Sequence, residues 1–196
     1  MQNFDLLLKQ LEVTRGSNTI IRNHTTVTNS PPSAYNIGNH LGGGLQLLLL
    51  FFPDASLELI RWWAFHDYLE YETGDVVGAA KVKYPQLNKV LAEIEDDLEK
   101  NEYKILEGFE IEPLEKIVLD FIDRAELLLW CFEQYHMGCR TKRFLKMMNR
   151  VGEKVKKLRD EFNSKISKRP SEYDAHLSKG VANLYTIIEH LSKEIA

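Results

Sequence analysis

WWAFHDYLEYETGDVVGAAK, residues 62–81, is the stretch of the chain that decides the fold and the chemistry we expect. Its first residues complete an apolar helical run, and His66 and Asp67 stand together at the end of that run. Steps of three and four residues lead from Leu57 through Ile60 to Asp67, so a helix would place Asp67 on a buried stripe. A buried carboxylate needs a metal ion, a cation or a dense set of hydrogen bonds. A metal ion best accounts for the imidazole beside it.

The composition favours one globular domain over residues 1–196. The chain has 196 residues, 44% of them hydrophobic and 28% charged, which is enough for one sizeable core. Its net charge of -4 gives no general electrostatic reason to bind nucleic acid or an anionic membrane. We see no signal-peptide pattern at the N-terminus, and the longest apolar run, residues 47–52, is far too short for a membrane span. We therefore expect a cytoplasmic protein without a membrane partner.

The chain reads as helices joined by loops, with few signals for strands. Apolar spacing and caps predict helices over residues 3–13, 33–52, 54–71, 86–100, 113–137, 141–164 and from 171 to near the C-terminus. In the first of these, one apolar face predicts a short docking helix. Residues 15–32 are polar and lack helical periodicity, so we expect a long functional loop with an extended piece at residues 19–21. The prediction is an all-α bundle of about five to seven helices around one core.

Three consecutive glycines, Gly42, Gly43 and Gly44, fall inside the helix predicted over residues 33–52. Each glycine is about 1 kcal/mol less favourable than alanine in a helix interior. We therefore expect a neighbouring helix or a ligand to approach them closely. His40 lies one turn before Gly44 on an otherwise apolar face, which makes it a candidate ligand.

Two aspartates in the helix predicted over residues 113–137 have different neighbours. Asp120 has a lysine and an arginine four residues away on either side, the pattern of a solvated, charge-paired face. Asp123 has a leucine at each of these offsets, so it should point inward and need a positive partner. Two imidazoles and two carboxylates suit one divalent transition metal ion, such as Co, Mn, Zn, Fe or Ni. The candidate ligands are His40, His66, Asp67 and Asp123.

The order of these residues resembles the H…HD…D signature of the HD-domain metal-dependent phosphohydrolase superfamily. HDYLEYETGDVVGAAK, residues 66–81, is similar to the HDxxExxTGDxPxPxK stretch of bacterial 5'-deoxynucleotidases and phage-type deoxynucleotide phosphohydrolases, which include dATP triphosphohydrolases. RNHT, residues 22–25, resembles the R-aromatic-H-T element of the phage-type proteins. The resemblance covers the motif core, about residues 15–130, and leaves the C-terminal helices, residues 140–195, outside it. It implies an HD-domain helical bundle.

The resemblance also implies a role for each matching residue. The ligands of one catalytic divalent cation would be His40, His66, Asp67 and Asp123. Glu70 would orient or deprotonate the attacking water, and Asp75 would assist proton transfer or orient the substrate. The residues that would neutralise phosphate charge are Arg22, His24 and Lys81.

The function implied is metal-dependent removal of phosphate from nucleotides, as in a 5'-deoxynucleotidase, by metal-activated water. One alternative is a triphosphohydrolase of the dATP type, which releases nucleoside and triphosphate from a dNTP. Another is a non-catalytic HD module that binds nucleotides. Asn23 replaces the family's aromatic residue after the arginine, so the preference for deoxyribose stays open. The resemblance further implies a homodimer or higher homo-oligomer, in the host cytoplasm if the protein is phage-encoded.

The helix predicted over residues 141–164 carries a local excess of positive charge, with basic residues recurring from Arg140 to Arg159. A nucleic-acid surface is one interpretation. Phe144 is the single aromatic residue among them, so we favour a solvated face or a contact with the acidic residues 93–99. We expect no nucleic-acid partner.

Overall fold

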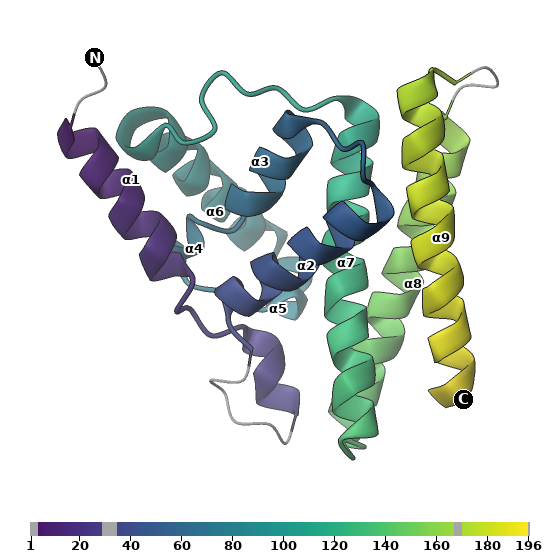
Figure 1. Cartoon of the computed structure of the whole chain (residues 1–196). Coiled ribbons are helices and arrows are strands. Elements are labelled where there is room, and N and C mark those ends of the chain that lie inside the picture. Colours follow the sequence, from purple (N-terminus) through teal and green to yellow (C-terminus); the bar gives the residue numbers. More distant parts are fainter. Residues whose placement is uncertain (1–3, 29–34, 167–169, 196) are drawn as a thin grey trace. The chain divides into compact units, whose positions relative to one another are not determined.

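The computed structural model describes residues 4–28, 35–166 and 170–195, and Figure 1 shows its course. Within these residues the regular elements are helices, and extended backbone pairs only in an isolated bridge between Ile21 and Asn36. The all-α prediction is therefore confirmed. None of the helices in the described ranges is both long enough and apolar enough to cross a membrane.

The helices match the predicted ones best in the second half of the chain. In order they are α1 (Phe4–Ser17), the 3-10 helix η1 (Asn23–Val27), α2 (Ile37–Phe51), α3 (Leu57–Phe65), α4 (Glu70–Thr73), α5 (Gly78–Lys83), α6 (Pro85–Leu98), the π-helix η3 (Glu99–Tyr103), α7 (Pro113–His136), α8 (Lys142–Lys165) and α9 (Glu172–Ile195). The helix predicted over residues 54–71 is interrupted, so His66 and Asp67 lie in the turn between α3 and α4. The first two residues of the helix predicted over residues 33–52 lie outside the described residues.

The chain divides into two compact units. Unit 1 comprises Met1–Thr26, Ser30–Asn39 and Phe65–Phe109. Unit 2 comprises Val27–Asn29, His40–Ala64 and Glu110–Ala196. The single domain over residues 1–196 stays a prediction.

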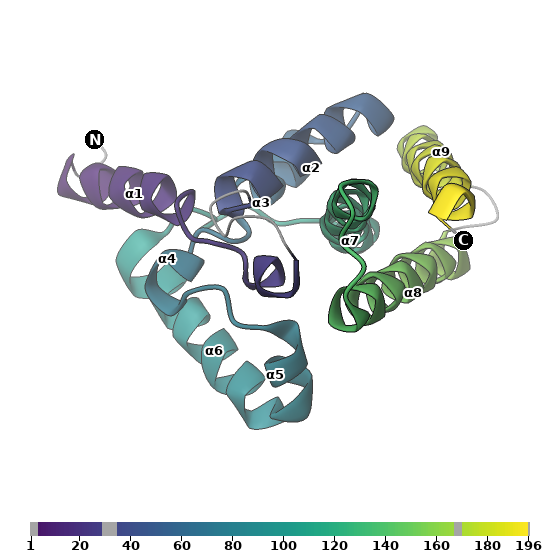
Figure 2. The ribbon, with the colours of Figure 1, turned by 90° about the horizontal axis from the view of Figure 1, so that it is seen from below.

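Unit 2 contains the three long helices α7, α8 and α9, which lie side by side in both Figure 1 and Figure 2. The helices pack through apolar side chains without exposed area, among them Phe121 and Ile122 of α7, Val155 of α8 and Leu184 of α9. Burial of this kind contributes about 1.5–3 kcal/mol for each large apolar side chain. The bundle thus gives a well-packed support to the polar residues of α7.

The glycines of α2 make room for bulky neighbours in unit 2. A Cβ on Gly44 would lie 1.9 Å from Cζ2 of Trp63, a fully buried residue. A Cβ on Gly43 would lie 2.9 Å from Oε1 of Glu126 on α7. Among the described residues nothing lies within 4 Å of such an atom on Gly42. The predicted close approach is therefore confirmed at two of the three glycines.

Unit 1 holds its short helices together through aromatic residues. Tyr68 is buried in the turn after α3, and its hydroxyl donates a hydrogen bond to the Glu99 carboxylate. Gly16 of α1 lies so close to Tyr71 that a Cβ there would be 2.3 Å from ring atom Cε2. These contacts hold the turn that carries His66, one of the predicted ligands.

The apolar face of α1 differs from its prediction. Phe4, Leu7, Leu8 and Leu11 should dock on the core, but their exposed fractions range from 40% to 70%. The buried residues of α1 are Val13 and Ser17, near its C-terminal end. The helix therefore docks at its C-terminal end, and the predicted docking face is wrong, because local periodicity identifies an apolar face without showing what covers it.

Candidate functional site

The predicted site residues fall into two groups, one in each unit. His40 and Asp123 belong to unit 2, where they lie with Trp63 and Glu126; we call these four the His40 cluster. The remaining predicted residues belong to unit 1 and are Arg22, His24, His66, Asp67, Glu70, Asp75 and Lys81. Of these, all except His24 form, with Glu95, what we call the Asp67 cluster.

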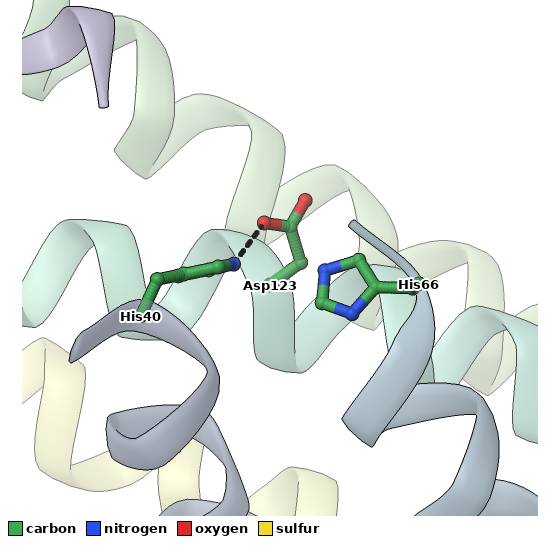
Figure 3. Close-up of side chains that lie close together, drawn as sticks. All are labelled: His40, His66 and Asp123. Atoms are coloured by element: carbon green, nitrogen blue, oxygen red, sulfur yellow. Dashed lines mark ion pairs between the residues drawn. The ribbon is translucent and has the colours of Figure 1, made fainter. Parts of the chain in front are cut away.

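His40 lies between two carboxylates of α7. Its Nε2 is 3.2 Å from Oδ1 of Asp123, the ion pair drawn in Figure 3, and its Nδ1 is hydrogen-bonded to Oε2 of Glu126. The His40 side chain has no exposed area, and those of Asp123 and Glu126 are 14% and 10% exposed. Metal-binding histidines usually donate one ring N–H to such a carboxylate, which orients the ring for the metal. His66, also labelled in Figure 3, belongs to unit 1.

Trp63 forms an aromatic wall beside His40. The two ring centroids are 5.4 Å apart, and the ring planes are tilted by 60°. The Trp63 indole N–H donates to the Leu41 carbonyl oxygen over 2.8 Å, which fixes the indole against α2. With water kept away on this side, the carboxylates act more strongly on the imidazole than they would in bulk water.

The two aspartates of α7 differ as their neighbours predict. Asp120 is exposed, whereas the Asp123 side chain is 14% exposed and faces His40. The second oxygen of Asp123, Oδ2, lies 3.1 Å from Nη2 of Arg124. Asp123 therefore has the positive partner that its burial requires.

Arg22 is the centre of the Asp67 cluster. It is 4% exposed, and its Nη1 lies 2.5 Å from Oδ2 of Asp67 and 4.0 Å from Oε2 of Glu70. The largely buried Asp67 carboxylate thus has a cation as its partner, one of the three kinds of partner that the sequence predicts. Arg22, which the resemblance assigns to phosphate, here holds carboxylates together.

Asp75 follows a turn that requires glycine. Gly74 has a φ of 68°, a backbone angle that residues other than glycine rarely adopt. Oδ2 of Asp75 accepts a hydrogen bond from the Asn23 backbone N–H over 2.5 Å and lies 3.9 Å from Nε of Arg22. The turn, the hydrogen bond from Asn23 and the ion pair with Arg22 hold the Asp75 carboxylate in the cluster.

His66 and Asp67 present neighbouring donor atoms. His66 Nε2 lies 3.4 Å from Oδ1 of Asp67, and both side chains are 15% exposed. Because Arg22 contacts the other oxygen of Asp67, the two carboxylate oxygens have different partners. An imidazole nitrogen and a carboxylate oxygen side by side are ligands of the kind that transition metals bind.

Glu70 lies among like charges. Burial raises the pKa of Glu70 to about 8, the Asp67 carboxylate adds to this increase, and Arg22 and Lys81 oppose it. Among the described residues its Oε2 has no hydrogen-bond partner. A carboxyl group whose pKa lies near neutrality suits proton transfer to or from water.

The Asp67 cluster carries more negative than positive charge. Its cations are Arg22 and Lys81 of α5, and its carboxylates are those of Asp67, Glu70, Asp75 and Glu95. With all of them ionised, the four carboxylates exceed the two cations by two charges. With Glu70 protonated, as its pKa of about 8 favours at neutral pH, the excess is one charge. A divalent cation would balance the excess of the fully ionised cluster. His24 lies in η1, two residues after Arg22.

Two acids of these clusters, Glu95 and Glu126, were not predicted from the sequence. Burial raises the pKa of Glu95. Lys81 opposes this increase and the Asp67 carboxylate adds to it, so Glu95 belongs to the Asp67 cluster. Glu95 stands in an acidic run, residues 93–99, and nothing in the run distinguishes it. Glu126 carries a usable signal, because it follows Asp123 by three residues and therefore shares its helix face.

A groove of about 810 Å³ lies within unit 2 between α7, α8 and α9. Its walls are largely apolar and include Leu128, Phe132, Met148 and Ile188. The described residues that line it include none of the predicted site residues. We therefore assign the groove no part in the chemistry.

No protein-family model, curated protein or solved structure matches this chain. The two clusters and the order of the motif residues are therefore the observations that bear on its function.

Proposed function

We propose that this chain is an HD-type, metal-dependent phosphohydrolase that removes phosphate from nucleotides, as a 5'-deoxynucleotidase does. The observation that carries the proposal is the fully buried His40, held between the Asp123 and Glu126 carboxylates. Carboxylate-oriented histidines of this kind are typical of metal centres. The order of His40, His66 with Asp67, and Asp123 along the chain supports the assignment of both clusters to one ion.

The donor set suits a divalent transition metal ion. His40, His66 and Asp123 offer two imidazole nitrogens and a carboxylate oxygen, and Asp67 would add a second carboxylate. Co, Mn, Zn, Fe and Ni all accept such ligands. When bound, the ion would lower the pKa of a water molecule and polarise a phosphoryl oxygen. The negative excess of the Asp67 cluster supports a dication.

Glu70 and Asp75 are the proposed groups for proton transfer and orientation. The raised pKa of Glu70 supports a role in which its carboxyl group exchanges a proton with the attacking water. Asp75 is held by the Asn23 N–H, which supports a fixed orienting role rather than a mobile one. The substrate would then be attacked at phosphorus by water that Glu70 holds in place.

The cations of unit 1 divide between two roles. Arg22 contacts Asp67 directly, which supports a positioning role for its guanidinium in addition to the phosphate contact implied by the resemblance. Lys81 and His24 remain the proposed phosphate contacts. Lys81 is partly exposed, so its ammonium is open to an anion from solvent.

Product analysis tests the proposed function. Metal-stripped protein is reloaded with each metal, incubated with ribo- and deoxynucleoside mono-, di- and triphosphates, and the products are separated by chromatography. Release of inorganic phosphate from monophosphates is expected of a 5'-nucleotidase. Release of intact triphosphate from a dNTP would establish the triphosphohydrolase alternative. Nucleotide binding without turnover under any metal would contradict catalysis and leave a binding module.

The resemblance also leads us to propose a cytoplasmic homo-oligomer. The exposed apolar face of α1, formed by Phe4, Leu7, Leu8 and Leu11, supports a contact between subunits. A second copy of the chain is the partner that would cover it.

A further inference from the structure

Helix α8 carries a row of cations along one exposed face. The whole chain has a net charge of -4, yet α8 contains nine lysines and arginines and three acids. Four of these cations follow one another at steps of three, four and seven residues and therefore share a face of the helix. All four are exposed; we call them the α8 row, and they are Arg143, Lys146, Arg150 and Lys157.

Another face of α8 packs into unit 2. A Cβ on Gly152 would lie 4.0 Å from Cδ2 of Leu128, so α8 touches α7 there. Figure 2 shows α7 and α9 on the same side of α8. The side chains of α8 that are buried on this side are Phe144, Met148, Val151, Val155 and Phe162. The α8 row thus remains open to solvent over about 21 Å, the rise of fourteen residues at about 1.5 Å each.

The α8 row lacks ion-pair partners in the described ranges. The ion pairs within α8 join Arg159 to Asp160 and Lys165 to Glu161, near the end of the helix. No member of the row forms an ion pair with a described residue. Glu153 is exposed on the same side of the helix and offsets one of the four charges. The row therefore keeps a positive excess at an accessible surface.

Lys154 borders the α8 row but is not part of it. Burial lowers the pKa of Lys154, the Arg124 guanidinium lowers it further, and the Asp123 carboxylate opposes the decrease. Lys154 thus belongs to the surroundings of Asp123, where cations and carboxylates of α7 balance each other.

The acidic run at residues 93–99, which the sequence suggests as a partner of α8, is engaged within unit 1. Each of its acids has a partner there. The pairs are Glu93 with Lys89, Asp96 with Lys100, Asp97 with Asn101 and Glu99 with Tyr68, and Glu95 belongs to the Asp67 cluster. The contact predicted between α8 and this run thus loses its unpaired carboxylates, and the α8 row is available to an anion from outside the chain.

From this geometry we propose that the α8 row binds the phosphate backbone of duplex DNA without reading its sequence. One strand of a duplex presents a phosphate about every 3.4 Å, so a straight row of about 21 Å spans about six of them. Cations that neutralise phosphates release condensed counterions, which drives binding of this kind. A net charge of -4 on the whole chain does not prevent it, because charges act mainly within a Debye length of about 10 Å.

The side chains around the α8 row favour a duplex over other polyanions. Binding of single strands uses exposed aromatic rings on which bases stack, and the aromatic residues of α8, Phe144 and Phe162, are both fully buried. Binding to a membrane surface uses exposed apolar side chains that enter the lipid, and those of α8 that are large and apolar are mostly buried in unit 2. Phosphate contacts need neither feature, so the local row outweighs the expectation of no nucleic-acid partner.

Fluorescence anisotropy of a labelled duplex of mixed sequence tests the α8 row. The full chain is titrated into the duplex at several salt concentrations between about 50 and 200 mM. Four phosphate contacts predict that log affinity falls with log salt with a slope of about -3.6. Arg150→Gln and Lys157→Gln should each reduce the size of this slope by about 0.9 and raise the Kd about five- to tenfold at about 0.1 M salt.

Lys156→Gln is the matched control for Lys157→Gln. It removes the same charge one residue away, on the side of α8 that lines the groove. This variant should change the Kd less than about twofold and leave the slope near that of the parent.

The outcomes separate a defined surface from general attraction. Equal losses in Lys156→Gln and Lys157→Gln would show that the charge of α8 as a whole attracts DNA, and would overturn the inference. Absence of binding at about 50 mM salt would also overturn it. Tighter binding of the single strand than of the duplex would reject the duplex as the partner. Binding to phosphatidylserine vesicles without binding to the duplex would assign the row to a membrane surface instead.

Nucleotide turnover, measured with metal-loaded protein, separates the α8 row from the proposed catalytic site. Turnover should be unchanged in Arg150→Gln and Lys157→Gln, because neither residue belongs to the His40 cluster or the Asp67 cluster. A loss of turnover in these variants would contradict a separate surface. DNA binding by a protein that hydrolyses no nucleotide would support the row and reject the proposed function.

Discussion

At the scale of single residues, Glu126 determines how His40 is presented. The Glu126 carboxylate accepts a hydrogen bond from Nδ1 of His40, so Nε2 of the same ring faces Asp123. Gly43 is the residue of α2 that leaves space for this carboxylate, because a Cβ there would lie 2.9 Å from Oε1. The orientation of the His40 ring thus depends on Glu126, which would not itself be a metal ligand.

Replacing Glu126 should weaken metal binding without removing a ligand. We expect Glu126→Gln to raise the Kd for Co²⁺ about 10–100-fold, the usual effect of losing such an orienting carboxylate. Competition with a chromophoric chelator measures this Kd. Glu133→Gln is the matched control, since Glu133 is an exposed acid on the same helix. Unchanged Co²⁺ affinity in Glu126→Gln would contradict the orienting role.

Glu70 should make the stability of the metal-free protein depend on pH. Its pKa rises from 4.5 to about 8 in the folded chain, so the folded state holds the proton more tightly than the unfolded state. Stability contributed by that proton is present at low pH and is lost as pH rises through about 8. The glutamine of Glu70→Gln is neutral at every pH, so the Tm of this variant should exceed that of the parent at pH 9. Each kcal/mol of difference in the free energy of unfolding raises Tm by about 2–4 °C. An equal difference at pH 5 and pH 9 would refute the raised pKa.

At the scale of elements, α2 depends on the contact between Gly44 and Trp63. A Cβ on Gly44 would lie 1.9 Å from the Trp63 ring, whereas a Cβ on Gly42 would have no atom of the described residues within 4 Å. Gly44→Ala should therefore destabilise the fold by about 1–3 kcal/mol through overpacking. Gly42→Ala should stabilise it by up to about 1 kcal/mol through helix propensity. Urea unfolding of both variants gives the comparison, and equal stabilities would show that the close packing is absent.

Part of the secondary structure could be predicted from the sequence. Pro113, Thr141 and Ser171 mark the starts of α7, α8 and α9, and the structure places each helix start within one residue of them. Thr141 Oγ1 accepts from the Phe144 N–H over 3.2 Å, as a helix cap does. These signals are local, so a single sequence contains them.

Other features depend on residues distant in the sequence. The apolar spacing continues through Asp67, yet α3 ends at Phe65, and Asp67 pairs with Arg22, which precedes it by 45 residues. Neither the turn nor this partner has a local signal. Glu95 likewise enters its cluster through tertiary packing alone. The candidate ligands could be proposed because they stand at apolar faces, and Arg22, Glu70, Asp75 and Lys81 because they match the motifs of the resemblance. The contacts among these residues, and the presence of Glu95 beside them, depend on tertiary packing.

At the scale of the whole molecule, the exposed face of α1 bears on assembly. Light scattering after size exclusion should give a mass that is a multiple of 22.7 kDa. Leu8→Lys should shift the mass to that of one chain, because it places a charge in the proposed contact. Leu50→Lys is the control, since Leu50 is exposed on α2 and lies outside that face. A parent protein of single-chain mass, or an oligomer unaffected by Leu8→Lys, would contradict this assembly.

Binding of a catalytic metal ion by Asp123 is the proposal on which the others depend. The most direct measurement compares metal content and nucleotide turnover in Asp123→Asn and Asp120→Asn, two equal changes one turn apart on α7. Metal content is determined by mass spectrometry after dialysis against chelator-free buffer. We expect Asp123→Asn to lose both the metal and turnover, whereas Asp120→Asn keeps both near the parent level. Retention of metal and turnover by Asp123→Asn would contradict it.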